Sequence, residues 1–401
     1  MAQNVHRFFV LSVIFLLCLS SINAEDFQYK YNEGDMYRIL STVSEDVYID
    51  YQLSHKVEIL NRIAVEVMQV SEGKGKHKAV FQTSERDLGG DGSYQWAREY
   101  ESEFERDRLG RMNIDKQYYM PVVRDVPVFS GRDIKPGEKW SCDGHEVHDF
   151  RDNFGIKDPY QIPFSANYVY LGNRTWKGKT YPAFSVSYRI QSEPLAVSGL
   201  IWPKRILGAS DQTVYWDSDM GQAAAYSEEF RYVFEFSNGR TVEYRGRAEA
   251  EIIESISMDR EKIVEEIGRE IQRMDIPDVT VRAVDEGITI SLDNIQFQPD
   301  TAVMLPGERE KLDKIVDILL RYRERDILVG GHTALAGTAE GRMKLSVERA
   351  AVVADYLITR KARTPDRVVV RGYGAEKPLA DNGTEEGMRK NRRVEITLLE
   401  N

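Results

Sequence analysis

The sequence ILVGGHT at residues 327–333 is followed by an amphipathic stretch at 345–360 and by the apolar run VVV at 368–370. Short apolar runs next to turn residues are typical of buried strands, whereas apolar residues three and four positions apart are typical of helices. Strand, helix and strand in this order indicate a βα unit, in which the helix covers one face of a sheet. We therefore expect an α/β sandwich in this part of the chain.

Similar elements flank this unit on both sides. Apolar residues at helical spacing, among them Ile263 and Ile267, predict a helix over 259–274 that ends before Pro277. A second amphipathic pattern predicts a helix over 311–320. Three further short runs complete the set of expected strands, at 279–281, 288–292 and 394–398.

Five short motifs occur in order along the same region. They are Asn294-Ile295-Gln296-Phe297, Gly331-His332-Thr333, Leu345-Ser346 with Arg349-Ala350, Gly372-Tyr373-Gly374 with Pro378, and Asn391-Arg392-Arg393-Val394. With these motifs, residues 285–399 resemble the OmpA-like C-terminal domain, which is shared by OmpA, peptidoglycan-associated lipoproteins and flagellar stator proteins. The first motif matches the opening strand of that family, so the resemblance implies a strand at 294–297. The resemblance implies non-covalent binding of the peptidoglycan stem peptide, and it implies no cofactor, no metal and no catalytic residue.

The resemblance also implies which residues contact the ligand. By position, Arg349 takes the carboxylate of the diamino acid in the stem, because a guanidinium fork donates two parallel hydrogen bonds to a carboxylate. Arg392 lies near the same pocket in the family, and Thr333 and Asn391 shape that pocket. The chain departs from the family at Ala334, where the family has an Asp that holds the amine of the ligand.

This departure leaves two functions open. Ala334 removes a carboxylate, and Arg342 stands where the family usually has an Asn. A lost hydrogen bond to a charged group costs about 1.5–3 kcal/mol, which is about ten- to hundredfold in affinity. One expectation is a structural cell-envelope protein that binds peptidoglycan weakly or with altered specificity. The alternative is a degenerate module that no longer binds peptidoglycan and serves as a scaffold for protein–protein contacts.

The first 24 residues predict a secretory signal peptide. A positively charged start precedes an apolar run at 8–19, which is too short to cross a bilayer as a helix, and a short polar segment ends at Ala24. Cleavage after Ala24 leaves Cys142 as the only cysteine, so no intramolecular disulfide is expected. Lipidation at Cys18 is the alternative, although Leu17 stands where that signal normally needs a small residue.

Residues 25–256 predict an all-β domain, either an antiparallel sandwich or an open barrel. Apolar and polar residues alternate over 184–190 and 230–236, and Asn238-Gly239 after the second run indicates a type I′ hairpin turn. A membrane-spanning barrel is the alternative for this domain. The long charged loop expected over 101–111 counts against that alternative.

One cluster in this domain contains residue types that bind zinc, namely Cys142, His145, Glu146 and His148. On a strand, Cys142, Glu146 and His148 share a face while His145 points away. A zinc site needs four convergent ligands, and no second His/Cys cluster completes this one. We therefore expect a polar strand edge and no enzyme. An envelope hydrolase that uses Cys142, His145 and His148 is the remaining alternative.

The chain is thus expected to have three parts: a signal peptide at 1–24, a β-rich domain at 25–256, and an OmpA-like domain with a leading amphipathic helix at 257–401. The signal peptide directs the protein to the periplasm, either free or associated with the outer membrane. The net charge of −11 counts against nucleic acid as a partner, because nucleic-acid binders usually carry a basic face. The expected partners are peptidoglycan and an envelope protein bound through the β-rich domain.

Overall fold

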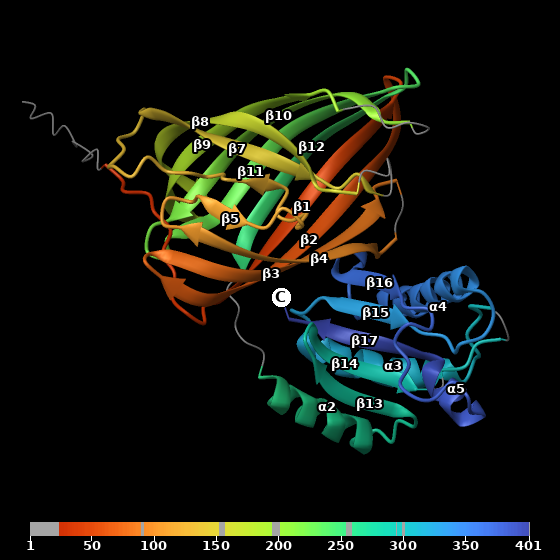
Figure 1. The fold of residues 1–401 in the computed structure, drawn as a ribbon. Coiled ribbons are helices and arrows are strands. Elements are labelled where there is room, and N and C mark those ends of the chain that lie inside the picture. The colour runs from red at the N-terminus through yellow and green to blue at the C-terminus, as the bar shows by residue number, and fades with distance from the viewer. Residues whose placement is uncertain are drawn as a thin grey trace, which may run out of the picture.

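The computed structural model describes residues 24–89, 92–151, 157–194, 201–253, 259–293, 295–298 and 301–400. The expected signal peptide up to residue 23, with Cys18, lies outside the described residues, and so does Asn294. The described part consists of a large N-terminal sheet and a smaller C-terminal α/β region, which meet at one edge (Figure 1). This arrangement confirms the predicted fold class.

The N-terminal strands form an antiparallel meander, in the order β6-β7-β8-β9-β10-β11-β12-β1-β2-β3-β4-β5. The sheet curves strongly round its inner face (Figure 1). It is open, because no ladder joins β5 to β6 in the part of the chain that the structure describes. The strands are β1 (Met36–Ile49), β2 (Gln52–Ser71), β3 (Lys74–Asp87), β4 (Tyr94–Asp107), β5 (Met112–Ile114), β6 (Val123–Arg124), β7 (Lys139–His148), β8 (Tyr160–Trp176), β9 (Lys179–Ser192), β10 (Pro203–Asp217), β11 (Gln222–Phe236) and β12 (Thr241–Ile253).

The inner face of this sheet holds an aromatic core. Phe184 and Tyr188 of β9 are buried, as the alternation over 184–190 predicts, because successive side chains of a strand point to opposite faces. The rings of Phe129 and Trp216 lie 4.8 Å apart in an edge-to-face arrangement, which is a favourable geometry for aromatic pairs. The alternation of apolar and polar residues in the sequence therefore predicts which side chains of β9 enter this core.

Two local predictions for this sheet are wrong. Residues 101–107 belong to β4 and do not form a loop, because the glutamates at alternate positions face outward while Ser102 and Phe104 face inward. The Asn238-Gly239 hairpin joins β11 to β12 as expected. Of these two residues, however, only Gly239 has a positive φ, at 85°. A type I′ turn requires a positive φ at both central residues, so the turn is of another type.

The C-terminal region has a five-stranded sheet in the order β13-β14-β17-β15-β16. Strands β15 and β16 run parallel and are connected by α4, whereas the other neighbours are antiparallel. The elements are α2 (Arg260–Arg273), β13 (Val279–Val284), β14 (Gly287–Asp293), α3 (Glu308–Leu319), η1 (Leu320–Tyr322), β15 (Ile327–Gly331), α4 (Ala339–Thr359), η2 (Pro365–Arg367), β16 (Val368–Gly372), α5 (Glu385–Asn391) and β17 (Arg393–Leu399).

The two faces of this sheet differ. Helices α2, α3 and α4 pack on one face, where alternate strand residues such as Ile290 and Val329 are fully buried against them. The hydroxyls of Thr289 and Thr397 lie 2.7 Å apart on the opposite face, which also carries a small apolar patch. The patch consists of Leu328, Val369 and Leu399.

The helix and strand predictions hold for most of this region, with three corrections. Helix α4 begins earlier than the predicted 345, because the hydroxyl of Thr338 accepts a hydrogen bond from the Gly341 N–H at 3.1 Å and caps the helix. Helix α5 is not predicted. The expected strand at 294–297 is absent from its described residues, where Phe297 forms an isolated bridge with Met304.

Among the described residues, no helix is long and apolar enough to span a membrane.

Candidate functional site

The candidate site lies where β15 and β16 end. The loop that follows β15 carries His332, Thr333 and Ala334, and α4 begins shortly after it. A Cβ at Gly331 would lie 2.0 Å from the backbone oxygen of Ser346, so only glycine permits this close approach of β15 to α4. The tight packing holds the loop against the first turns of α4.

Arg349 projects from α4 toward the segment before α3. Its Nε donates a hydrogen bond to the backbone oxygen of Thr301 at 3.1 Å, and its guanidinium lies 4.9 Å from the centre of the Phe297 ring. A guanidinium over an aromatic face is favourable, and the planar group is held in one orientation. The structure thus brings Phe297 and Arg349 together, which the sequence motifs do not indicate.

Thr333 and Ala334 form the buried part of the loop. The Thr333 N–H donates to the Gly374 oxygen at 2.8 Å, whereas the Thr333 hydroxyl is buried and has no hydrogen-bond partner among the described residues. Ala334 is 5% exposed and offers only a methyl group where the expected ligand contact needs a carboxylate. Arg342 braces the same loop, because its Nη1 donates to the Gly337 oxygen at 2.5 Å.

Asn391 and Arg392 have different surroundings. Asn391 is fully buried, and its side-chain oxygen accepts hydrogen bonds from the N–H groups of Leu379 and Ala380 at 2.7 and 3.0 Å. Arg392 is more exposed, and its Nη2 lies 3.2 Å from Oε1 of Glu385. Arg392 thus faces Glu385, whereas the contacts described above for Arg349 are with Phe297 and Thr301. Asn391 therefore fixes the loop before α5, and Arg392 faces a carboxylate of the protein itself.

His332 belongs to an ionic group on the sheet face opposite the helices. Its ring stacks on Tyr373 with centroids 4.7 Å apart, and its Nε2 lies 3.5 Å from Oε2 of Glu395. Burial lowers the pKa of His332. Burial alone would raise the pKa of Glu395, but His332, Arg393 and Arg282 together hold it well below its usual range. This group stabilises the sheet and is separate from the Arg349 contact.

The cluster on β7 is only partly a strand edge. Strand β8 pairs with all of β7 on one side, whereas β6 pairs on the other side with His145 and Glu146 alone. Glu146 is fully buried, and its Oε1 accepts hydrogen bonds from the hydroxyls of Tyr188 and Tyr232 at 2.9 and 2.5 Å. Its Oε2 lies 2.9 Å from Nε2 of His148. No group of three or more potential metal ligands occurs within the described ranges. Glu146 is thus an internal hydrogen-bond acceptor that the sequence analysis missed.

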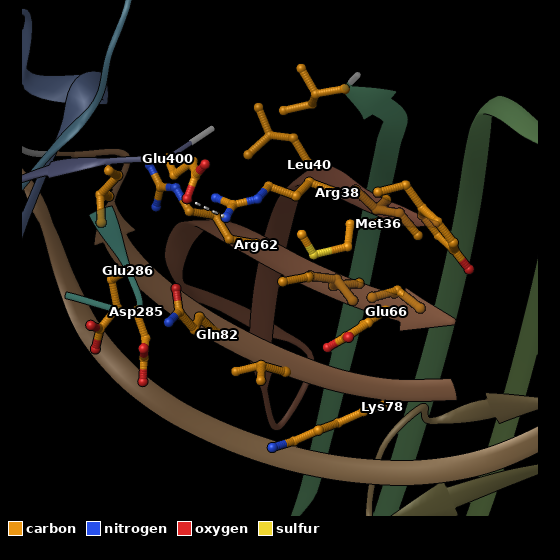
Figure 2. A pocket seen from close by; sticks show the side chains of 18 of the residues that line it. Met36, Arg38, Leu40, Arg62, Glu66, Lys78, Gln82, Asp285, Glu286 and Glu400 are labelled. Carbon is orange, nitrogen blue, oxygen red and sulfur yellow. Dashed lines mark hydrogen bonds and ion pairs between the residues drawn. The ribbon is translucent and has the colours of Figure 1, made fainter. Parts of the chain in front are cut away.

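A groove of about 840 Å³ lies between the outer face of β1–β3 and the C-terminal region (Figure 2). Met36 and Leu40 are among its apolar residues, and charged residues from both parts of the chain surround them. Arg38 Nη2 lies 3.3 Å from Oε2 of Glu400, as the dashed line in Figure 2 marks. Arg38 and Glu400 therefore form an ion pair between the two parts of the protein.

The sequence profile described as "OmpA family" matches residues 296–392, a range that contains Thr333, Arg349, Asn391 and Arg392. Residues 296–392 form an OmpA family domain. The peptidoglycan-binding protein ArfA of Mycobacterium tuberculosis is 36% identical over 104 residues, which are 26% of this chain and 32% of ArfA. Outer membrane protein A of Bordetella avium is 37% identical over 103 residues, which are 26% of this chain and 53% of that protein.

A solved structure is also similar to the OmpA family domain. The cell wall anchor of the T6SS from Pseudomonas aeruginosa is 26% identical and covers 36% of this chain and 100% of its own, with a TM-score of 0.31. The chain spans about a third of the length of ArfA and about half the length of the Bordetella protein. Other relatives include outer membrane porin F of Pseudomonas aeruginosa, so proteins of the outer membrane and cell envelope share this domain.

Proposed function

We propose that the protein is a structural, non-enzymatic component of a bacterial cell envelope, and that its OmpA family domain binds the peptidoglycan stem peptide non-covalently. The observation that carries the proposal is the profile match over 296–392, a range that contains Arg349. ArfA, which shares this region, is named a peptidoglycan-binding protein.

The chemistry of the site supports recognition of a carboxylate. The guanidinium of Arg349 is held between Phe297 and the Thr301 oxygen, so little conformational entropy is lost when it binds a ligand. A guanidinium that is already oriented matches a carboxylate with two charge-assisted hydrogen bonds. The Thr333 hydroxyl, in the loop after β15, is buried and has no hydrogen-bond partner among the described residues.

The amine of the ligand has a weaker partner in this protein than in the family pattern. Ala334 replaces the carboxylate that would hold the amine, and the missing contact is equivalent to about ten- to hundredfold in affinity. We infer that the protein binds weakly, or that it favours stem peptides in which the carboxylate is the main recognition element. Arg392, which pairs with Glu385, must exchange that partner before it contacts a ligand.

A second candidate follows from the same two residues. A pocket without the Asp, in which Arg392 faces a carboxylate of the protein, is also what a domain that has lost wall binding would have. In that case the domain serves as a scaffold for another envelope protein. In either case we propose export by a signal peptide at 1–24, a periplasmic or outer-membrane-associated location, and domains at 25–256 and 257–401.

Co-sedimentation with purified peptidoglycan sacculi tests the proposal. The full mature chain is expected to pellet with sacculi and to be released by an excess of free stem peptide, but not by a stem peptide whose diamino-acid carboxylate is amidated. If the wild type stays in the supernatant and Ala334→Asp pellets, the second candidate is correct. If neither protein pellets, the domain does not bind wall peptide and the proposal is wrong.

A further inference from the structure

The C-terminal region, residues 259–400, joins an edge of the N-terminal sheet through its own edge strand, β16. Strand β16 pairs in parallel with the start of β4, with Val369 opposite Tyr94 and Val370 opposite Gln95. Without β4, the outer side of β16 would be an unpaired edge, which is a site of unwanted association in sheet proteins. The two sheets of the protein are therefore continuous at this point (Figure 1).

A small apolar cluster lies beside this pairing. Leu328, Val369 and Leu399 project from the face of the C-terminal sheet that the helices leave uncovered, and all three are buried. They pack against Leu60 and Tyr94 of the N-terminal sheet, which are 5% and 2% exposed. On separate parts these residues would form apolar patches on both outer surfaces, so each part carries the complement of the other.

Ion pairs flank the cluster on two sides. Asp326 lies between Arg62 of β2, at 2.6 Å, and Arg367 of the C-terminal region, at 2.8 Å. Glu400 lies 3.3 Å from Arg38 of β1 and also pairs with Arg260 at the start of α2. Both carboxylates are nearly buried, so their charges need the arginines of both parts.

A cation–π contact also joins the two parts of the protein. The guanidinium of Arg371, at the end of β16, lies 4.0 Å from the ring centre of Trp96 on β4. Backbone pairing, apolar packing, nearly buried ion pairs and this contact thus occur together. Domains of one chain usually move relative to each other unless apolar contacts hold them together.

From these contacts we propose that the outer face of β1, β2 and β4 is a docking surface for the C-terminal region of the same chain, which contains the OmpA family domain, and that the two parts form one rigid body without help from the chain that connects them. The occupant of the surface is residues 259–400. If the proposed function is correct, the β-rich part is held at a fixed orientation to the cell wall and does not move on a tether. The docking itself does not depend on wall binding, and its test needs no peptidoglycan.

The test cuts the connection and asks whether the parts separate. A protease recognition sequence is inserted between Ile253 and Asp259 of the full chain, and the purified protein is cleaved and passed over a size-exclusion column at low micromolar concentration. The two fragments are expected to elute together in one peak of unchanged mass by light scattering. Separate elution of the wild-type fragments would overturn the proposal, and so would a dimer before cleavage in which the domains exchange between chains.

Matched variants locate the interface. Leu60→Glu places a charge in the apolar cluster and is expected to release the C-terminal fragment after cleavage, with at least a tenfold loss of co-elution at equal concentration. Leu53→Glu makes the same change at a half-exposed position of the same strand and is expected to leave the fragments together. Arg62→Glu sets two carboxylates against each other at Asp326 and is a second disrupting variant that leaves the apolar cluster intact. If the fragments of both disrupting variants co-elute as those of the wild type do, the docking surface is not where we place it.

Discussion

Ala334→Asp is expected to tighten binding of the stem peptide by about tenfold. A hydrogen bond to a charged group contributes about 1.5–3 kcal/mol, and each 1.4 kcal/mol is about tenfold in affinity. Ala334 is buried in a loop whose backbone is fixed by the bond from Thr333 to Gly374, so the new carboxylate has a defined position but loses part of its hydration. The lost hydration reduces the net gain in binding free energy, so we expect the lower end of the range, which is about tenfold in affinity.

Isothermal titration calorimetry at pH 7 with a soluble stem peptide measures the effect. The matched control is Ala336→Asp, which adds the same charge to the same loop at an exposed position. The control is expected to change the dissociation constant by less than about twofold, since exposed charges interact weakly in water. Thermal unfolding of both variants checks that the loop is intact. Equal effects of the two substitutions, or no effect of Ala334→Asp, would refute the reasoning about position 334.

Three further predictions concern stability. Asn391→Ala is expected to lower the free energy of unfolding by about 2 kcal/mol, because two N–H groups lose their buried acceptor; chemical denaturation measures this, and an unchanged midpoint would contradict the assigned role. Glu146→Ala is expected to cost about 3 kcal/mol, and Glu146→Gln clearly less, because the amide oxygen still accepts from Tyr232; equal losses for both would argue against a hydrogen-bonding role. Burial lowers the pKa of His77 to about 4, so below about pH 6.5 the unfolded chain takes up a proton that the folded protein does not. Stability should therefore fall by about 2 kcal/mol from this residue between pH 7 and 5, and His77→Phe, which keeps the stack on Phe104, should reduce the decline. A pH dependence identical to that of the wild type would show that His77 does not titrate as described.

The sequence predicts the fold where one periodicity dominates. The alternation of β9 and β17 matches one face of a sheet, whereas the continuous apolar runs of β15 and β16 are buried on both faces, and all four are found as strands. Residues 101–107 are mispredicted because the glutamates that face outward on β4 give the segment the composition of a charged loop. Helix α5 has seven mostly polar residues and no apolar repeat, so its pattern carries too little information.

Only part of the candidate site can be predicted from the sequence. The motifs indicate Arg349 and Arg392, but they do not indicate that Arg392 faces Glu385 or that Arg349 lies over Phe297. Those contacts join residues that are far apart in the sequence or lie in irregular segments, so a periodic pattern does not predict them. The pairing of β16 with β4 cannot be predicted for the same reason, since it joins two strands that are far apart in the sequence.

The central claim is that Arg349 binds the carboxylate of a peptidoglycan stem peptide. The most direct measurement is the dissociation constant of the full mature chain for soluble stem peptide, compared between wild type, Arg349→Ala and Arg360→Ala. Arg360 follows the same helix and pairs with Asp313 of the protein, so its removal controls for loss of one positive charge on α4. Arg349→Ala is expected to weaken binding by about ten- to hundredfold, and Arg360→Ala to change the dissociation constant by less than about twofold. Equal affinities of wild type and Arg349→Ala would contradict the claim.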